Sequence, residues 1–299
     1  MIPELRLPSP IYPVQGLDNQ FEWWVKRDDL IHKILSGNKY RKLKRILETV
    51  SKMGGKGIIS FGGAYSNHLH ALAYVCHHLQ IECVCIIRGE EVRNQTISDL
   101  RSWDAKLHFV SRADYSIKEK SDSIRNLIYD KYPDFLLIPE GGNMDLALTG
   151  TSEIIDELAE QIDFVPDYIL CAAGTGTTAA GIWQGIMAHG WHSKLCVFSA
   201  LKGDFLKSDI ERKCPGIWDS HAFFIDRFHY GGFAKLTSEL KQEIDDIAKM
   251  INVPLDYVYN GKLIRGVKEL MDQNFFHKGA RIVWIHTGGL QGNKGFDQK

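Results

Sequence analysis

The segment AAGTGTTAAG, residues 172–181, contains the residue types that bind a phosphate group. It follows the apolar, strand-like run DYILC and begins a helical pattern. Its glycines allow a tight turn that exposes backbone N–H groups, its threonines supply hydroxyl donors, and the helix start adds partial positive charge. The residues concerned are Gly174, Thr175, Gly176, Thr177 and Thr178. As an isolated motif, the segment is equally compatible with a structural turn between a strand and a helix.

The spacing within this loop narrows the choice of ligand. It matches neither the GxGxxG pattern of dinucleotide-binding loops nor the GxxxxGK[ST] pattern of nucleoside-triphosphate loops. The loop also carries no lysine of its own. We therefore expect the ligand to be a small phosphomonoester.

A second candidate for chemistry is Lys39, in the basic stretch LSGNKYRKLKRIL. Apolar residues recur in this region at helical spacing, which predicts a helix with one buried face. That face consists of Tyr40, Leu43, Leu47 and Val50. The other basic residues are then expected on largely solvated faces. They are Arg41, Lys42, Lys44 and Arg45.

Lys39 differs from its basic neighbours because it follows SGN, where Ser36 or Asn38 can cap the helix. Its amine therefore lies at the positive end of the helix dipole, where a cation is unfavourable by about 0.3–1 kcal/mol. Partial burial would lower the pKa of this amine further. A lysine with a lowered pKa is suited to forming an imine with a carbonyl compound.

The stretch FGGAYSNHLHALA, residues 61–73, repeats the order of strand end, glycine loop and helix start. Ser66 or Asn67 is a good N-cap for this helix, and capping alone would explain the serine. The free N–H groups of the helix start could also bind a carboxylate, with the Ser66 hydroxyl close to the reacting atoms. His68 could reach the same carboxylate. The structural and functional interpretations are compatible.

Short apolar runs alternate with helical patterns along the chain, and glycines stand at the ends of several runs. This alternation predicts an α/β protein whose parallel strands are covered by helices on both faces. The runs form two groups, around residues 54–142 and 168–289, so we expect two sheets rather than one. Ligands of such sheets bind beyond the carboxyl ends of the strands. The loops GGAYSN, PEGGN, AAGTGTT and HTGG are therefore expected to face one cleft.

The composition argues against several classes of function. The 299 residues include 36 Lys and Arg against 37 Asp and Glu, so no overall positive charge would collect nucleic acid or an anionic membrane. No segment approaches the roughly 20 apolar residues of a membrane span, and the first residues do not resemble a signal peptide. The six cysteines form no CxxC pair, which favours a reducing, cytoplasmic compartment. We expect no bound metal, because CHHLQIECVC has no second ligand pair at zinc-like spacing.

Six motifs taken together resemble one enzyme family. They are VKRDDL with SGNKYRKL, SFGGAYSNHLHALA, IPEGGNMDLALTG, AAGTGTTAAG, LDYVYNGK and HTGG. Their order and spacing, over about residues 23–290, resemble the pyridoxal-phosphate-dependent family that contains 1-aminocyclopropane-1-carboxylate (ACC) deaminase and D-cysteine desulfhydrase.

The resemblance implies a fold, a cofactor and an assembly. The fold is tryptophan synthase β-like (PLP fold type II), an α/β architecture of two open, twisted parallel-sheet domains. The cofactor, pyridoxal 5'-phosphate (PLP), would lie in the cleft between them. Residues 1–42 and 150–299 would form the larger domain and residues 43–149 a smaller inserted domain. A homodimer acting on a small amino acid is expected.

The resemblance also implies which residues hold the cofactor. Lys39 is similar to the lysine that forms the Schiff base, and the loop of residues 174–178 to the loop that binds the phosphate. Asn67 matches the residue that bonds the phenolic oxygen of the cofactor. Tyr259 matches the tyrosine beside the cofactor ring.

Other matched positions concern the substrate. Ser66 matches a serine that helps to bind the substrate carboxylate or to transfer a proton, and Asn67 and His68 are expected beside it. With Lys39, Ser66 and Tyr259, a second tyrosine, Tyr230, completes the expected catalytic set. Tyr230 lies in the segment FHYGGFAKLTSEL, which lacks the proline that usually follows YG in the family, so this wall of the pocket is expected to differ.

Two further cofactor contacts bear on the reaction. ACC deaminases carry Glu at the pyridine nitrogen, where this chain has Asn260, and Leu before the last GG, where it has Thr287. Thr287 resembles the desulfhydrase branch, and a neutral partner suffices for loss of an α-hydrogen and a β-thiolate. We therefore expect D-cysteine desulfhydrase-type α,β-elimination, giving pyruvate, ammonia and hydrogen sulfide. The alternatives are ACC deaminase, giving 2-oxobutanoate and ammonia, and a catalytically silent PLP-binding homologue.

Overall fold

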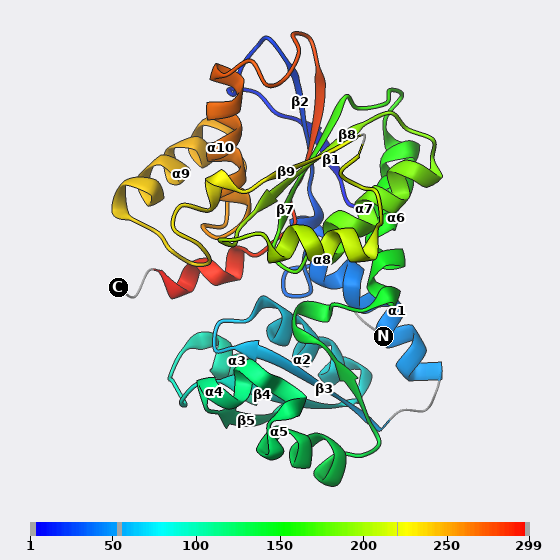
Figure 1. Ribbon diagram of the computed structural model, residues 1–299, viewed down its shortest axis with the longest axis vertical. Helices are drawn as coiled ribbons and strands as arrows, with labels where there is room; N and C mark the ends of the chain where they lie inside the picture. The colour runs from blue at the N-terminus through cyan, green and yellow to red at the C-terminus, as the bar shows by residue number, and fades with distance from the viewer. Residues whose placement is uncertain (1–3, 53–55, 220, 297–299) are drawn as a thin grey trace.

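The computed structural model describes residues 4–52, 56–219 and 221–296, which fold around two open sheets, one above the other in Figure 1. The larger sheet has six strands in the order β1-β2-β10-β7-β8-β9, and every neighbouring pair is parallel except β1 and β2. The smaller sheet has four parallel strands in the order β5-β4-β3-β6. The strands are β1 (Ile11–Pro13), β2 (Glu22–Lys26), β3 (Gly57–Gly63), β4 (Glu82–Arg88), β5 (Lys106–Val110), β6 (Phe135–Ile138), β7 (Tyr168–Ala173), β8 (Lys194–Ser199), β9 (Ala222–Ile225) and β10 (Arg281–Ile285).

Helices connect most of the strands and cover the sheets. They are α1 (Asn38–Lys52), α2 (Asn67–Leu79), α3 (Gln95–Ser102), α4 (Arg112–Ile117), α5 (Asp122–Asn126), α6 (Asp145–Gln161), α7 (Thr177–Ala188), α8 (Phe205–Lys213), α9 (Ser238–Ile251) and α10 (Asn260–Asp272). Shorter helical segments lie at Asp28–Leu30, Lys118–Lys120, Leu127–Lys131, Glu140–Gly142, Arg227–His229 and Leu290–Gly295.

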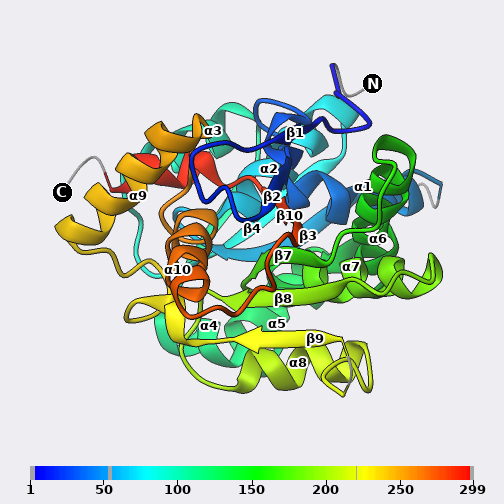
Figure 2. The ribbon, with the colours of Figure 1, turned by 90° about the horizontal axis from the view of Figure 1, so that it is seen from above.

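The larger sheet is buried on both faces, as the apolar strands predict. Alternate residues of β7 belong to two different cores, because successive side chains of a strand point to opposite faces. Leu170 packs with residues of α9 and α10, whereas Ile169 packs with residues of α6 and α7. Figure 2 shows these two pairs of helices on opposite sides of the sheet. The predicted α/β class with two parallel-sheet domains is confirmed, and the predicted boundaries after residues 42 and 149 stay a prediction.

Helix α1 is held by both halves of the molecule. Its predicted apolar face is confirmed, because Tyr40, Leu43, Leu47 and Val50 lie in the core of the smaller sheet. On another side α6 approaches so closely that a Cβ added to Gly150 would lie 2.0 Å from the backbone oxygen of Arg41. Few side chains of α1 are therefore left in solvent.

The prediction that Arg41 and Lys42 lie on solvated faces is wrong, since their exposed fractions are 0% and 2%. The guanidinium of Arg41 donates to Asp28 Oδ1 at 2.8 Å and to Glu157 Oε1 at 2.6 Å. These acceptors come from other parts of the chain, and a buried cation needs such partners. Lys44 and Arg45 are partly exposed and form ion pairs with Glu153, which is closer to the prediction.

Candidate active site

The loops at the carboxyl ends of the strands meet in one place, as the sequence predicts. A Cβ added to Gly37, in the SGN turn, would lie 2.0 Å from the backbone oxygen of Thr287 in the HTGG loop. A Cβ added to Gly141, in the PEGGN loop, would lie 2.9 Å from Cγ2 of Thr175. Both glycines also have positive φ angles, so a larger residue would be strained at either contact; the first contact is with backbone and the second with a side-chain methyl group.

The SGN turn sets the position of Lys39. Gly37 has a φ of +62°, which an L side chain rarely adopts. The backbone N–H of Gly37 donates to the oxygen of Asp28 at 2.8 Å, and that of Asn38 donates to the oxygen of Thr287 at 3.1 Å. The residue before Lys39 is therefore fixed to a strand end far away in the sequence.

Lys39 is partly buried, and burial lowers the pKa of its amine to about 8, an effect that the negative charge of Asp256 partly offsets. The lowered pKa agrees with the sequence prediction. Its Nζ donates to Asn38 Oδ1 at 2.9 Å, and Asn38 Nδ2 donates to Thr178 Oγ1 at 3.1 Å. Asn38 is the first residue of α1 and uses its side chain to join Lys39 to the phosphate loop, so the expected capping role is not the one it has.

The loop of residues 174–178 leads into α7 as predicted. Gly176, with a φ of +75°, precedes the helix, and a Cβ there would lie 2.4 Å from Cγ1 of Ile210. Thr177 Oγ1 donates to Asn143 Oδ1 of the PEGGN loop at 2.8 Å. The loop thus presents a helix N-terminus and hydroxyl groups on the side where both sheets end.

Lys42 supplies this loop with a buried amine. Its Nζ donates to Thr175 Oγ1 and to the backbone oxygen of Gly141, both at 3.0 Å. Burial, and then the charge of Lys39, lower the pKa of Lys42 well below its usual value. We missed this residue in the sequence, although its position three residues after Lys39 places the two on one helix face.

Tyr259 lies against the other side of the loop. A Cβ added to Gly174 would be 3.1 Å from both Cε1 and the hydroxyl of Tyr259. Burial raises the pKa of the tyrosine above its usual value, so the hydroxyl stays protonated. Tyr259 immediately precedes α10, and its backbone N–H donates to Asp256 Oδ1 at 2.7 Å.

Ser66 and Asn67 lie at the start of α2. Ser66 Oγ accepts a hydrogen bond from the N–H of Leu69 at 3.2 Å, so the predicted cap is confirmed. Asn67 lies beside the HTGG loop, where a Cβ added to Gly289 would be 3.4 Å from its Nδ2. The buried Oδ1 of Asn67 has no hydrogen-bond partner among the described residues. An amide in this state is available to a ligand.

His68 faces the smaller sheet as well as the cleft. Its Nε2 lies 2.8 Å from Ser60 Oγ, and its Nδ1 is buried without a partner in the described part of the chain. Burial, followed by the charges of Lys39 and Lys42, lowers the pKa of His68 to about 3. The imidazole is therefore neutral near pH 7, so any contact with a carboxylate would be a hydrogen bond and not an ion pair.

Asn260 is fully buried at the start of α10, and its side chain makes several hydrogen bonds. Its Nδ2 donates to Asp256 Oδ2 at 2.6 Å and to the backbone oxygen of Gly288 at 3.0 Å. Its Oδ1 accepts from Trp284 Nε1 at 3.2 Å and from the N–H of Thr287 at 3.3 Å. The amide is thus occupied by protein partners and fixes Thr287 next to it.

Thr287 lies next to Asn260, and its hydroxyl hydrogen is available to donate a hydrogen bond. Its Oγ1 lies 3.4 Å from Asn260 Nδ2, and no hydrogen bond described for the chain uses its hydroxyl hydrogen. The closest carboxylate, Asp256, already accepts the backbone N–H groups of Val258, Tyr259 and Asn260. The group presented at this end of β10 is therefore neutral.

Tyr230 is not brought to this cluster by any described contact. Its hydroxyl is buried without a partner among the described residues, and burial raises its pKa to about 12. The charges that also act on that pKa are Arg265, Glu269 and Glu243, which belong to α9 and α10. Phe233, three residues further on, has its ring centre 6.0 Å from that of Tyr259. Sequence reasoning missed Phe233, because the motif drew attention to the tyrosine.

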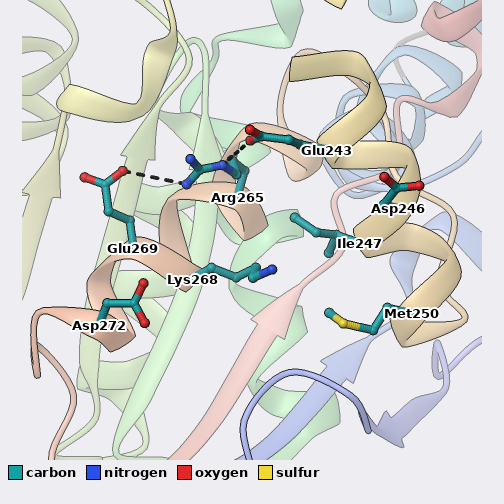
Figure 3. Close-up of a pocket in the computed structure, with 8 residues that line it drawn as sticks. All are labelled: Glu243, Asp246, Ile247, Met250, Arg265, Lys268, Glu269 and Asp272. Carbon is teal, nitrogen blue, oxygen red and sulfur yellow. Dashed lines mark hydrogen bonds and ion pairs between the residues drawn. The ribbon is translucent and has the colours of Figure 1, made fainter. Parts of the chain in front are cut away.

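One hollow in the surface lies elsewhere, in a groove between α9 and α10 (Figure 3). It is lined by Glu243, Asp246, Ile247, Met250, Arg265, Lys268, Glu269 and Asp272. Arg265 is already paired with two of the acids, as the dashed lines show. This groove contains none of the predicted site residues.

Two expected absences can be examined in the described ranges. No group of three or more His, Cys, Asp or Glu side chains there could hold a metal ion. None of the helices described combines the length and the apolar character needed to cross a membrane. The six cysteines are buried free thiols.

The loops at the ends of two parallel sheets bring a lysine next to a loop that is suited to a phosphate group. This arrangement is typical of enzymes that hold a phosphorylated cofactor between two domains. The sequence pattern of the family "pyridoxal-phosphate dependent enzyme" matches residues 2–288, and the chain belongs to this family. The cofactor is accordingly PLP.

Curated relatives and solved structures agree with the assignment. The chain is 30% identical over 310 residues to the mitochondrial bifunctional D-cysteine desulfhydrase/ACC deaminase of Arabidopsis thaliana, covering 96% of this chain and 77% of that one. It is 30% identical over 299 residues, 95% of each protein, to a putative ACC deaminase of Thermotoga maritima. The crystal structure of an ACC deaminase homologue superposes with a TM-score of 0.84 at 22% identity, covering 99% of this chain and 93% of that one.

The residues present fit PLP. Lys42 and the loop of residues 174–178 match a phosphate group, because they combine a buried amine that an anion can protonate, hydroxyl groups and a helix N-terminus. Lys39 has the lowered pKa of an imine-forming amine, and Asn67 has an unpartnered buried amide oxygen within the described structure. The individual roles of these residues, the homodimer and the cytoplasmic location stay predictions.

Proposed function

We propose that this chain is a PLP-dependent lyase that eliminates the β-substituent of a small D-amino acid, with D-cysteine as the first candidate. The products would be pyruvate, ammonia and hydrogen sulfide, formed from D-cysteine and one water molecule. The observation that carries the proposal is the neutral pair of Asn260 and Thr287 at the end of β10, where both side chains are buried.

PLP, when bound, acts as an electron sink for negative charge that develops at the α-carbon of the substrate. The resemblance assigns Asn260 and Thr287 to the side of its pyridine nitrogen. A hydroxyl that already accepts from Asn260 can donate its hydrogen to a neutral nitrogen, but it cannot supply the negative charge that would keep the nitrogen protonated. The sink is then moderate, which suffices when the substrate has an acidic α-hydrogen and a good leaving group.

Lys39 is the residue proposed to move the proton. With its pKa lowered to about 8, a large fraction of the amine is neutral at slightly alkaline pH and can accept the α-hydrogen. D-cysteine offers this hydrogen, and its thiolate leaves as the C–S bond breaks. Lys39 then returns the proton to the products, so the step needs no oxidant or reductant.

The start of α2 is proposed to bind the substrate carboxylate. The first N–H groups of a helix lack partners within the helix and carry partial positive charge. Ser66 and Asn67 stand at this position, and Asn67 also lies against the HTGG loop. His68 is neutral, so its polar ring could contact the carboxylate by a hydrogen bond without adding a charge to the site.

ACC deamination is the second candidate, because relatives of this chain are named for that activity. ACC has no hydrogen on its α-carbon, so its ring must open by another route that benefits from a stronger electron sink. The neutral Asn260–Thr287 pair disfavours this route.

The test is to purify the holoenzyme and to supply D-cysteine, L-cysteine, D-serine and ACC separately. Sulfide, keto acid and ammonia are measured, and the visible spectrum of the cofactor is recorded during each addition. Sulfide and pyruvate from D-cysteine support the proposal. Formation of 2-oxobutanoate from ACC without sulfide from D-cysteine would replace it with the second candidate, and spectral changes without any product would point to a silent homologue. Lys39→Ala is the control, and turnover that survived it would contradict the role of Lys39.

A further inference from the structure

Lys262 on α10 is a buried lysine whose hydrogen bonds, among the described residues, go to backbone carbonyls and not to a carboxylate. Its exposed fraction is 2%, and its Nζ donates to the oxygens of His229 and Gly232, both at 2.9 Å. Burial lowers its pKa to about 8, although Asp256 acts in the opposite direction. Burying an amine is costly unless it makes hydrogen bonds, so both bonds hold the same loop firmly.

The loop that Lys262 holds has an unusual backbone. Tyr230 and Ala234 have positive φ angles of 48° and 55°, and the two glycines between them have 89° and 110°. Non-glycine residues in this region are strained, and they persist when the surroundings hold them in place. The N–H of Gly232 bonds to the oxygen of His229, so the lysine closes a turn that is already tight.

The held loop carries Phe233 to the side of Tyr259. The two rings meet edge to face, with centres 6.0 Å apart and planes at 63°. Tyr259 in turn lies against Gly174 of the phosphate loop. The exposed fraction of Phe233 is 51%, so much of its side chain remains accessible.

We propose that Phe233 forms the outer wall of the pocket for the substrate side chain, and that Lys262 is the positioning residue that keeps this wall in place. The proposal rests on the proposed function and deepens it by naming the side chains that the site accepts. They are short and uncharged, with sulfur or carbon at the β-substituent.

The chemistry of the wall supports this range of substrates. The phenyl ring of Phe233 has no polar atom, so it cannot satisfy a carboxylate or an ammonium at the substrate side chain. Sulfur, by contrast, makes favourable contacts with aromatic rings, and both Phe233 and Tyr259 offer ring edges or faces. As the outer wall, the ring would also limit the length of the side chain that the site accepts.

The first test measures binding and not turnover. The holoenzyme is titrated with alanine and norvaline, each as D- and L-enantiomer, and dissociation constants are taken from the visible spectrum. We expect Phe233→Ala to improve the binding of norvaline relative to alanine by about tenfold, from the two additional methylenes that the space would admit. Phe233→Tyr should leave the ratio within about twofold. Phe223→Ala, at the opposite end of β9 from this loop, is the matched control.

Two results would overturn the role of Phe233. One is a norvaline-to-alanine binding ratio that Phe233→Ala leaves unchanged. The other is a visible spectrum of the wild-type holoenzyme that none of the four ligands changes. Neither result depends on elimination from D-cysteine, because alanine and norvaline carry no leaving group. Failure of the proposed function would instead appear as ligand binding with no sulfide from D-cysteine.

The second test addresses Lys262 through the mobility of the loop. Lys262→Met should increase hydrogen exchange of residues 229–235 at least tenfold and shift the norvaline-to-alanine ratio in the direction of Phe233→Ala. Lys262→Arg keeps donors and should restore both properties in part. Lys268→Met on the same helix, in the surface groove of Figure 3, should change neither. Unchanged exchange in a folded Lys262→Met variant would overturn the positioning role. Should the Met variant not fold, Lys262→Gln, whose shorter amide cannot reach both carbonyls, takes its place and the same result would overturn the role.

Discussion

Lys42 donates a hydrogen bond of 3.0 Å to Oγ1 of Thr175, a residue of the loop that precedes α7. This contact crosses from α1 to the start of α7 and gives the loop the amine that it lacks in its own sequence. Because burial lowers the pKa of Lys42, the amine is ready to take up a proton when an anion arrives beside it.

Lys42→Met should weaken the equilibrium binding of PLP by about 10- to 150-fold, which corresponds to the loss of one charge-assisted hydrogen bond of about 1.5–3 kcal/mol. Dialysis of the apoenzyme against graded PLP concentrations would measure this. Lys44→Met, which removes a partly exposed partner of Glu153, is the control and should change the affinity less than threefold. Equal affinities of the two variants would contradict the phosphate role.

The rate at which apoenzyme forms an imine with added PLP should depend on the ionisation of Lys39. The neutral amine is the nucleophile, so the rate should fall as the pH decreases through about 8 and should level off above about pH 9. Stopped-flow absorbance from pH 6 to 10 would record the profile. A midpoint near pH 10.4, the value of an ordinary lysine, would show that the burial seen here does not act on the amine.

Gly37→Ala should cost about 2–5 kcal/mol of unfolding free energy, because it combines a strained φ with a clash against the backbone of Thr287. Gly190→Ala is a matched control: Gly190 has nearly the same φ, +63°, but nothing within 4 Å of an added Cβ. It should lose only the strain, about 1–2 kcal/mol. Urea denaturation of both apoproteins gives the comparison, and equal losses would mean that the SGN turn is not pressed against the HTGG loop.

Asn260→Glu should destabilise the fold by about 3–5 kcal/mol, because it places a second carboxylate beside Asp256 Oδ2 in a fully buried position. Protonation of one of two adjacent carboxyl groups removes their repulsion, so this loss should shrink as the pH falls. The double variant Asp256→Asn/Asn260→Glu should recover most of the stability. Denaturation midpoints between pH 5 and 8 would test the expected order of stability, which is wild type, then the double variant, then Asn260→Glu. An Asn260→Glu variant as stable as wild type would be incompatible with the hydrogen bond from Asn260 to Asp256.

Glu157 should make the protein sensitive to acid. Burial alone would raise its pKa, but the hydrogen bond and charge of Arg41, together with those of Lys26, outweigh burial and lower the pKa to about 2. The stabilisation is complete above the unfolded value near 4.3 and is lost as the pH falls toward 2. Unfolding free energies of wild type and Glu157→Gln should therefore converge in acid, and parallel pH curves would argue against the ion pair.

Much of the fold could be predicted because the relevant signals are local. The runs that became β3, β4, β7, β8 and β10 are apolar and end near glycine, and the helices between them have clear apolar faces. Strands β5 and β6 were not predicted. Their burial is mostly partial and their sequences, KLHFV and FLLI, are short, so their strand character depends on pairing with β4 and β3.

The residues of the candidate site that belong to a motif were predicted from the sequence. The residues whose positions depend on a partner far away in the chain were missed. Lys39 and the threonines of the phosphate loop were identified from spacing alone. Arg41 was expected in solvent because its partner Glu157 lies 116 residues away, and periodicity carries no information about such a contact. Phe233 was overlooked because the motif drew attention to Tyr230, and because its position beside Tyr259 depends on the loop that Lys262 holds.

The hydrogen bonds of Asn38 have a consequence for the order of events during protein synthesis. Asn38 and Lys39 leave the ribosome early, yet Asn38 binds Thr178, 140 residues later in the chain, and its backbone binds Thr287. A nascent chain that ends before Thr287 therefore has Lys39 but not the support that positions it. Capture of the cofactor should wait until translation has passed that residue, whichever part of the chain folds first.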